Sequence, residues 1–147
     1  LEETGIRYSQ EVDMIREAHE LDMLTTPYAF DVQQATELTE AGADLIVAHM
    51  GLTTKGSIGA ETARTLEDCA REVGEIAHAA KSVRGDVIVL CHGGPIAMPE
   101  DAQFIFDRVP EVDGFYGASS MERLPTEVAI TDQIKSFKSL TFSRTTE

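Results

Sequence analysis

The chain has 147 residues, 42% of them hydrophobic, which is enough for one domain with a substantial core and argues against a disordered tail. Its 26 acidic and 12 basic residues give a formal charge of -14, so we expect neither a nucleic-acid nor a membrane partner. No apolar stretch approaches the roughly 20 residues of a membrane helix, and we expect no signal peptide. The two cysteines lack the spacing of a metal site or a disulfide framework, which favours a reducing, cytoplasmic location.

Helical and strand-like patterns alternate along the chain. Apolar side chains recur with a helical period at residues 9–21, 32–41, 65–84, 99–109 and 125–140. Ser9 and Asp31 are suitable N-caps, and Pro99 and Pro125 suit a first helical turn. Strands are expected near residues 23–30, 44–49, 87–92 and 113–118, with Pro27 indicating an irregular or terminal position in the sheet. Strands separated by helices predict parallel pairing and an α/β fold.

The polar, glycine-rich stretches follow the strands at their carboxyl ends. The apolar run at residues 87–91 ends in His92 and two glycines, and the run at residues 44–48 ends in His49. A doubly wound sheet usually binds phosphate at a G-x-G-x-x-G turn, and none follows a strand in this sequence. A (β/α)8 barrel instead gathers its active site at the carboxyl ends of its strands. We therefore expect parallel β/α units of a TIM barrel, in one domain over residues 1–147, although four strands make only half of a barrel.

Four segments make the sequence recognisable. The runs LTTPYAF, AGADLIVAHMGLTTKGSIGA, VIVLCHGGPI and GFYGASSMERLPTE resemble the TIM-barrel family known as phosphoenolpyruvate hydrolase-like, also described as phosphonopyruvate hydrolases. The resemblance covers nearly the whole chain, with the motifs in the same order. It implies that these four strands are the fifth to eighth of a barrel of roughly 250 residues, and that this chain is its carboxyl-terminal half.

Two histidines are the candidate catalytic residues. His92 has an ordinary pKa near neutrality, so it can exchange a proton with an enol or a phosphonate, or donate a hydrogen bond to phosphate. His49 ends its strand in the same way, with Gly51 and Thr53 nearby as candidate substrate-binding residues. The alternative for a strand-end histidine is a structural hydrogen bond to a neighbouring backbone carbonyl. Cys91 precedes His92 but points to the opposite face of the strand, so we expect a buried structural thiol.

The glycine-rich turns are candidate binding sites for a phosphate or a carboxylate. Backbone N–H groups and hydroxyls are available at Gly93, Gly94, Gly117, Ser119 and Ser120. Tight turns after parallel strands also favour glycine, which is the structural alternative. The loop at residues 53–59, with Lys55, suits a lid over an anionic substrate or is simply a solvated loop.

Glu122 and Arg123 follow the last turn. Glu122 is a candidate base or Mg²⁺ ligand, and Arg123 is a candidate bidentate clamp for a substrate carboxylate. They can equally pair with each other or with another loop. Barrels that handle enol phosphates often use Mg²⁺, but the sequence contains no clustered carboxylate site, so the cofactor is left open.

These residues predict an enzyme that acts on a small anionic substrate, a phosphorylated or phosphono three-carbon acid. The alternative is a non-catalytic module that senses the same ligand and regulates a partner domain. Half of a barrel leaves two sheet edges unpaired. We therefore expect the chain to associate with the other half of the barrel or with a second copy of itself.

Overall fold

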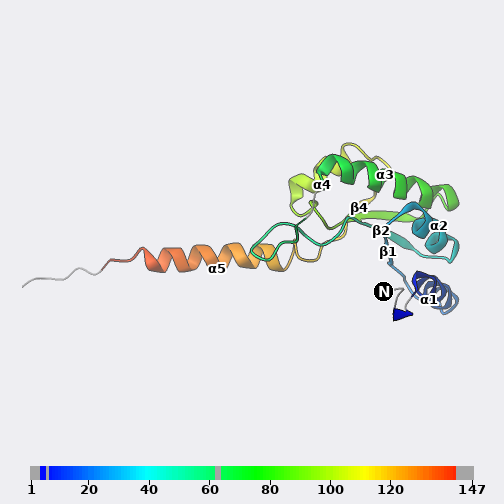
Figure 1. Cartoon of the computed structure of the whole chain (residues 1–147), viewed down its shortest axis with the longest axis horizontal. Coiled ribbons are helices and arrows are strands. Elements are labelled where there is room, and N and C mark those ends of the chain that lie inside the picture. The colour runs from blue at the N-terminus through cyan, green and yellow to red at the C-terminus, as the bar shows by residue number, and fades with distance from the viewer. Residues whose placement is uncertain (1–3, 6, 62–63, 142–147) are drawn as a thin grey trace, which may run out of the picture.

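The computed structural model describes residues 4–5, 7–61 and 64–141, in which helices and strands alternate (Figure 1). The elements are α1 (Tyr8–Glu20), β1 (Tyr28–Ala29), α2 (Val32–Glu40), β2 (Leu45–His49), α3 (Leu66–Val83), β3 (Ile88–His92), α4 (Pro99–Phe106), β4 (Gly114–Phe115) and α5 (Arg123–Lys138). The order agrees with the alternation that the sequence predicts. None of the helices in these ranges is long and apolar enough to cross a membrane.

The four strands form one parallel sheet in the order β1-β2-β3-β4. The two outer strands are shorter than the sequence pattern suggests. Beside β1, the chain still follows β2, because the N–H groups of Leu45 and Val47 donate to the carbonyls of Thr25 and Pro27. Pro27 has no N–H to donate, so regular pairing begins only at Tyr28. The predicted irregular or terminal position of Pro27 in the sheet is consistent with this geometry.

Successive helices pack side by side on one face of the sheet. α2 contacts α3, α3 contacts α4, and α1 contacts α2 beside the β1 edge (Figure 1). Thr65 and Asp68 cap the start of α3 reciprocally, and the Asp31 carboxylate accepts the Gln34 N–H at the start of α2. The core lies between these helices and the sheet, where Ile46, Val73, Ile76, Val89 and Cys91 are among the buried side chains.

The sequential strand order identifies the barrel-like architecture. In a doubly wound sheet the strand order reverses and helices cover both faces, whereas in a barrel each unit adds beside the previous one with its helix outside. This chain follows the second pattern, so it has the α/β fold of successive barrel units. Residues alternate along a strand, so His49 and His92 share the other face with Ile88, which is 43% exposed.

Helix α5 departs from the compact arrangement of the other helices. It projects away from the body of the molecule (Figure 1), and Leu124 is its only buried residue. Its predicted apolar stripe exists, but Ile130, Ile134 and Phe137 are 55%, 54% and 65% exposed. The helical period therefore predicts the element correctly, although the stripe contacts no core.

The opposite, amino-terminal rim has a structural role. The Asp44 carboxylate accepts hydrogen bonds from the N–H and the hydroxyl of Thr25, at 2.8 and 3.1 Å. The Asp113 carboxylate accepts from the Val89 N–H at 2.8 Å and from the Lys81 ammonium at 2.9 Å. Each aspartate thus ties the start of its own strand to the preceding strand.

Candidate functional site

A cluster of five rings lies where the four strands end at their carboxyl edge. The rings belong to Tyr28 in β1, Phe30 after β1, His49 in β2, His92 in β3 and Tyr116 after β4. Strand register places His49 opposite His92, with ring centroids 4.9 Å apart. Tyr28 stacks on His92 at 5.4 Å and tilts against His49 at 4.7 Å. The parallel sheet therefore brings both predicted histidines into one cluster.

The hydrogen bond of His92 assigns its tautomer. Its Nδ1 lies 2.7 Å from the carbonyl oxygen of Tyr116. A carbonyl oxygen only accepts, so Nδ1 carries the proton and donates it. In the neutral ring, Nε2 then holds a lone pair and acts as a hydrogen-bond or proton acceptor. His92 therefore makes the structural hydrogen bond to a backbone carbonyl through Nδ1, while Nε2 is available to accept a hydrogen bond or a proton.

His49 has the opposite tautomer. The backbone N–H of Gly51 donates to His49 Nδ1 at 3.0 Å, so Nδ1 is the acceptor and Nε2 carries the proton of the neutral ring. Burial, followed by the proximity of His92, lowers the pKa of His49 from its usual 6.5. The neutral form is therefore favoured near neutral pH. The turn at Gly51 has φ of 103°, a conformation that favours glycine.

The two imidazoles form a complementary pair. His49 presents an Nε2–H donor, and His92 presents an Nε2 acceptor from the neighbouring strand. Backbone groups, which do not titrate, determine both tautomers. One ring can donate a hydrogen bond while the other can receive a proton and return it, which is an arrangement suited to general acid–base catalysis.

The turns after β2 and β3 are bound to each other. The Gly94 N–H donates to the Gly51 carbonyl at 2.8 Å, and the Thr54 N–H donates to the Gly94 carbonyl at 3.2 Å. A Cβ at Gly93 would collide with the same Gly51 carbonyl. These glycines therefore permit close backbone approach, and the Gly94 N–H is already used within the protein. The predicted anion-binding roles of Gly51, Gly93 and Gly94 remain predictions.

The turn after β4 has free donors. The carbonyl of Ala118 accepts from the N–H groups of Met121 and Glu122, and the carbonyl of Ser119 accepts from those of Arg123 and Leu124. In the part of the chain that the structure describes, the N–H groups of Ser119 and Ser120 have no hydrogen-bond partner. Tyr116, whose carbonyl holds His92, precedes this turn directly. An anion at Ser119 and Ser120 would therefore lie on the loop that contacts the histidine pair.

Arg123, at the start of α5, contacts the loop at residues 53–59. Its guanidinium donates to the Glu127 carboxylate at 2.8 Å and to the Lys55 carbonyl at 3.0 Å. Glu127 also accepts from the N–H and the hydroxyl of Ser57, at 2.9 and 3.1 Å. The structure thus gives Arg123 partners in another loop, while its role as a substrate clamp remains a prediction. Glu122 lies exposed beside it, at the N-cap of α5.

A second connection ties the same loop to α4. Lys55 Nζ lies 2.6 Å from the Asp101 carboxylate, whose side chain is 8% exposed. Asp101 also accepts the backbone N–H groups of Ala97 and Met98, at 3.1 and 2.8 Å. Burial opposes ionisation of Asp101, but the hydrogen bonds from Lys55 and the two N–H groups keep its pKa below the usual value. Lys55 therefore holds its loop against the start of α4.

Mg²⁺ does not fit the donor set of the described residues. Among residues 4–5, 7–61 and 64–141 there is no group of three or more His, Cys, Asp or Glu side chains that could hold a metal ion. Glu122 is exposed, and the two histidines use one nitrogen each for backbone contacts.

Sequence reasoning missed three of the rings and the Asp101 contact. Tyr28, Phe30 and Tyr116 lie in strand-end motifs, and that position is the signal by which they could have been found. From the sequence alone, these three aromatic residues cannot be distinguished from residues of the hydrophobic core. Asp101 stands near the start of a predicted helix, where a capping role explains it without Lys55.

Comparison with known proteins places the chain in a family. The phosphoenolpyruvate hydrolase-like family model matches residues 1–140. A tomato (Solanum lycopersicum) protein named ToMV resistance protein Tm-1(GCR237) is 57% identical over 140 residues, which are 95% of this chain and 19% of that protein. A Sinorhizobium fredii protein, y4pA, whose name describes a transcriptional regulatory protein, is 28% identical over 95% of this chain and 23% of its own length. The chain thus spans about a fifth of these curated relatives.

A solved structure shares the fold. The crystal structure of the Amycolatopsis orientalis BexX/CysO complex aligns with 96% of this chain and 55% of that chain, with a TM-score of 0.51. The sequences are 14% identical, so the likeness concerns the fold alone.

Proposed function

The chain belongs to the phosphoenolpyruvate hydrolase-like family, and on that premise we propose that it contributes the acid–base half of an active site for a small phosphorylated or phosphono three-carbon acid. The observation that carries this proposal is the His49–His92 pair, in which neighbouring strand ends present one proton donor and one proton acceptor. Such a pair supports hydrolysis in which both proton transfers occur at one rim of the sheet.

The proposed reaction needs water and two proton transfers. His92 Nε2 takes a proton from the water that attacks phosphorus, and the P–O or P–C bond to the three-carbon unit breaks. His49 Nε2–H donates a hydrogen bond to the released enolate or carbanion, which then takes the proton that His92 received from water, so both rings end in their neutral forms. Phosphoenolpyruvate and phosphonopyruvate each give pyruvate and phosphate, so atoms and charge balance with one water consumed.

The turn after β4 is the proposed anion subsite. Ser119 and Ser120 supply unpaired N–H groups and hydroxyls at the start of α5. Donors of this kind favour a phosphate or carboxylate. They have to act locally, because the overall charge of -14 gives the chain little general attraction to anions. A Cβ at Gly117 would lie 2.6 Å from the Met121 side chain, so glycine leaves room for that side chain over the turn.

A regulatory module is the second candidate function. It is favoured by the names of the relatives, one of which describes a transcriptional regulatory protein and another a virus resistance protein. In such a module the same rim of the sheet binds the acid without turnover, and the surrounding polypeptide responds. The open edges of β1 and β4 would then contact further β/α units or a second copy.

Turnover and binding measurements separate the two functions. The chain is incubated with phosphoenolpyruvate or phosphonopyruvate, and pyruvate and phosphate are measured together. We expect equal release of both products, and a loss of about 10²-fold or more for His49→Ala and His92→Ala. His78→Ala is the matched control, because this histidine is 74% exposed and pairs with Glu111. Saturable binding without turnover would support the regulatory module, whereas the absence of binding would overturn both candidates.

A further inference from the structure

Two tyrosines flank the histidine pair from the outer strands. Tyr28 lies in β1 and Tyr116 follows β4, so with the histidines they occupy the ends of all four strands. The Tyr28 ring contacts both imidazoles, and the Tyr116 ring stands edge-on to His92, with centroids 5.7 Å apart. The two phenol rings also meet each other, nearly perpendicular and with centroids 6.1 Å apart. A ligand that reaches the imidazoles therefore also meets both phenols.

The hydroxyl groups of these two tyrosines are not used by the fold. Within residues 4–5, 7–61 and 64–141, neither hydroxyl has a hydrogen-bond partner. No buried side-chain nitrogen or oxygen of the described residues lacks a partner. Because Tyr28 and Tyr116 are half-buried, their unpartnered hydroxyl oxygens must be accessible from outside the protein. The third tyrosine differs, since the hydroxyl of Tyr8 donates to the Tyr28 carbonyl at 2.6 Å.

Both accessible hydroxyls are neutral hydrogen-bond donors near neutral pH. Burial, followed by the proximity of Tyr116, raises the pKa of Tyr28 from its usual 10, which keeps this hydroxyl protonated. The effect of Tyr116 on this pKa also indicates that the two phenol oxygens are near one another. Tyrosine hydroxyls are among the donors that form oxyanion holes, in which two donors share one negatively charged oxygen. The phenol pair therefore suits an enolate or carboxylate oxygen.

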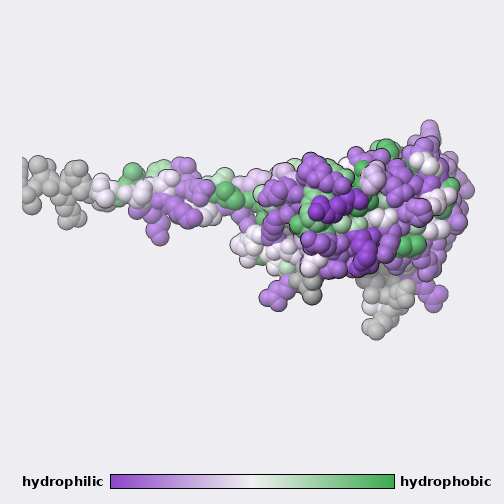
Figure 2. Space-filling model, turned by 90° about the horizontal axis from the view of Figure 1, so that it is seen from above, coloured by the Kyte–Doolittle hydropathy of each residue, from purple (hydrophilic) through white to green (hydrophobic). Residues whose placement is uncertain are grey.

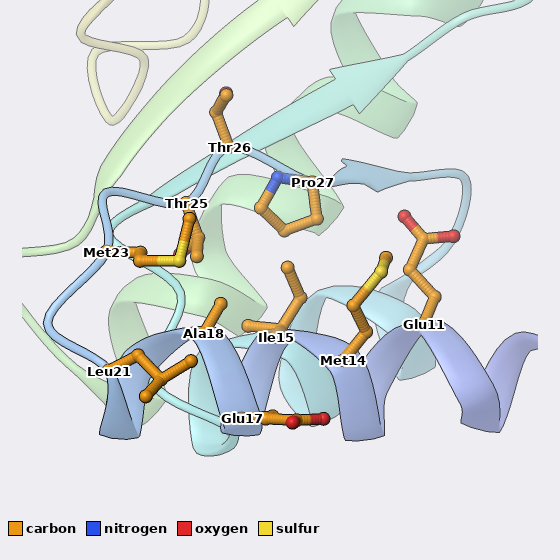
Figure 3. Close-up of a pocket in the computed structure, with 10 residues that line it drawn as sticks. All are labelled: Glu11, Met14, Ile15, Glu17, Ala18, Leu21, Met23, Thr25, Thr26 and Pro27. Atoms are coloured by element: carbon orange, nitrogen blue, oxygen red, sulfur yellow. The ribbon is translucent and has the colours of Figure 1, made fainter.

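Other parts of the molecule are less suitable for a small anion. Hydrophilic side chains cover much of the body in Figure 2, but the chain has 26 acidic and only 12 basic residues. The cavity beside α1, of about 490 Å³, is lined mainly by apolar side chains, and its charged residues are Glu11 and Glu17 (Figure 3). These carboxylates would repel an anion. By contrast, no carboxylate contributes to the raised pKa of Tyr28.

We propose that the Tyr28 and Tyr116 hydroxyls form an oxyanion-binding pair, which holds the enolate oxygen of the three-carbon product beside the two histidines. This inference rests on the proposed function. Breaking the P–O bond of phosphoenolpyruvate or the P–C bond of phosphonopyruvate leaves the electron pair with the three-carbon unit, so both substrates give the same pyruvate enolate. Negative charge develops on its oxygen as the bond breaks, and the two donors stabilise that charge most strongly at this point.

Binding of oxalate tests the pair without any turnover. Oxalate is a planar dianion that resembles the pyruvate enolate in shape and charge. Tyr28→Phe and Tyr116→Phe each keep the ring and remove one oxygen, so the dissociation constant for oxalate, measured by calorimetry, should rise about tenfold in each variant. The urea midpoint of both variants should stay at the wild-type value, because the fold does not use these hydroxyls. Tyr8→Phe is the contrast, since loss of its bonded hydroxyl should lower the midpoint.

Inorganic phosphate is the control ligand. Its proposed subsite is the turn at Ser119 and Ser120, so its dissociation constant should change less than about threefold in the two phenylalanine variants. With phosphoenolpyruvate as the substrate, each variant should lose about 10²-fold in kcat with little change in KM, because the hydroxyls act on charge that develops only in the transition state.

Failure of this inference differs from failure of the proposed function. If both variants bind oxalate and turn over the substrate as the wild type does, the phenol pair is not the oxyanion site, while the roles of the histidines stand. A parallel loss of phosphate and oxalate binding would overturn the enolate assignment, because the phenols would then bind anions in general. If the wild type does not bind oxalate, the inference is overturned whether or not turnover occurs. If the wild type binds oxalate through the phenols without turnover, the enolate role fails together with the proposed enzyme.

Discussion

Replacing Asp101 with Ala should destabilise the chain far more than replacing its ion-pair partner. The Asp101 side chain is 8% exposed and accepts the Lys55 ammonium and the N–H groups of Ala97 and Met98. Loss of the capping hydrogen bonds costs about 1 kcal/mol, and the unpaired N–H of buried Ala97 costs about 1–3 kcal/mol more. The free energy of unfolding should therefore fall by about 2–4 kcal/mol in Asp101→Ala.

The ion pair itself should contribute less. Lys55 is 42% exposed, so water replaces much of what the lysine supplies, and Lys55→Met should cost about 1 kcal/mol or less. Glu100→Ala, an exposed change in the same helical turn, should stay within about 0.5 kcal/mol of wild type. Urea unfolding followed by circular dichroism measures all three. If Lys55→Met costs as much as Asp101→Ala, the ion pair and not the backbone hydrogen bonds dominates, and the reasoning is refuted.

Three further predictions concern pH, backbone conformation and thiol reactivity. The folded pKa of His49 lies below its unfolded value of 6.5, so the contribution of His49 to stability is complete above that pH and is lost as pH falls. His49→Gln should therefore flatten the dependence of the unfolding free energy on pH between about pH 7 and 5. An unchanged slope would contradict this. Gly94→Ala should lower the free energy of unfolding by at least about 1–2 kcal/mol, because φ at Gly94 is 59° and a Cβ would collide with the Met50 carbonyl. Gly85 has open space around it, so Gly85→Ala should be nearly neutral in the same urea titration. Burial raises the pKa of Cys69 to about 11 and that of Cys91 to about 12. Mass spectrometry should therefore find both thiols unlabelled by iodoacetamide at pH 8 until urea unfolds the chain. Rapid labelling of the folded chain would show instead that the thiols are accessible.

The local elements follow from the sequence because their causes are local. Apolar residues at helical spacing predict α3 nearly to the residue, and the structure shows that a capping box of Thr65 and Asp68 begins it. The outer strands are less predictable, because pairing on one side only, and a proline without an N–H, shorten β1 beyond what its apolar pattern suggests. The stripe on α5 predicts a helix, but periodicity alone does not say what covers it.

The candidate site was predictable in its position but not in its chemistry. His49 and His92 end neighbouring strands, and parallel strands place their carboxyl ends together. The proton positions depend on the Gly51 N–H and the Tyr116 carbonyl, and the second of these is 24 residues from the ring it contacts. The same holds for Arg123, whose partner Lys55 is 68 residues away.

The sequence by itself determined the alternation of elements, the parallel sheet and the rim at which its two histidines meet, because periodicity and strand direction are properties of short segments. The tertiary structure alone decided which nitrogen of each histidine carries its proton, which loop binds Arg123, and that α5 leaves its apolar face exposed. These depend on backbone groups and surfaces that approach only after the chain has folded, and a linear pattern carries no record of such contacts.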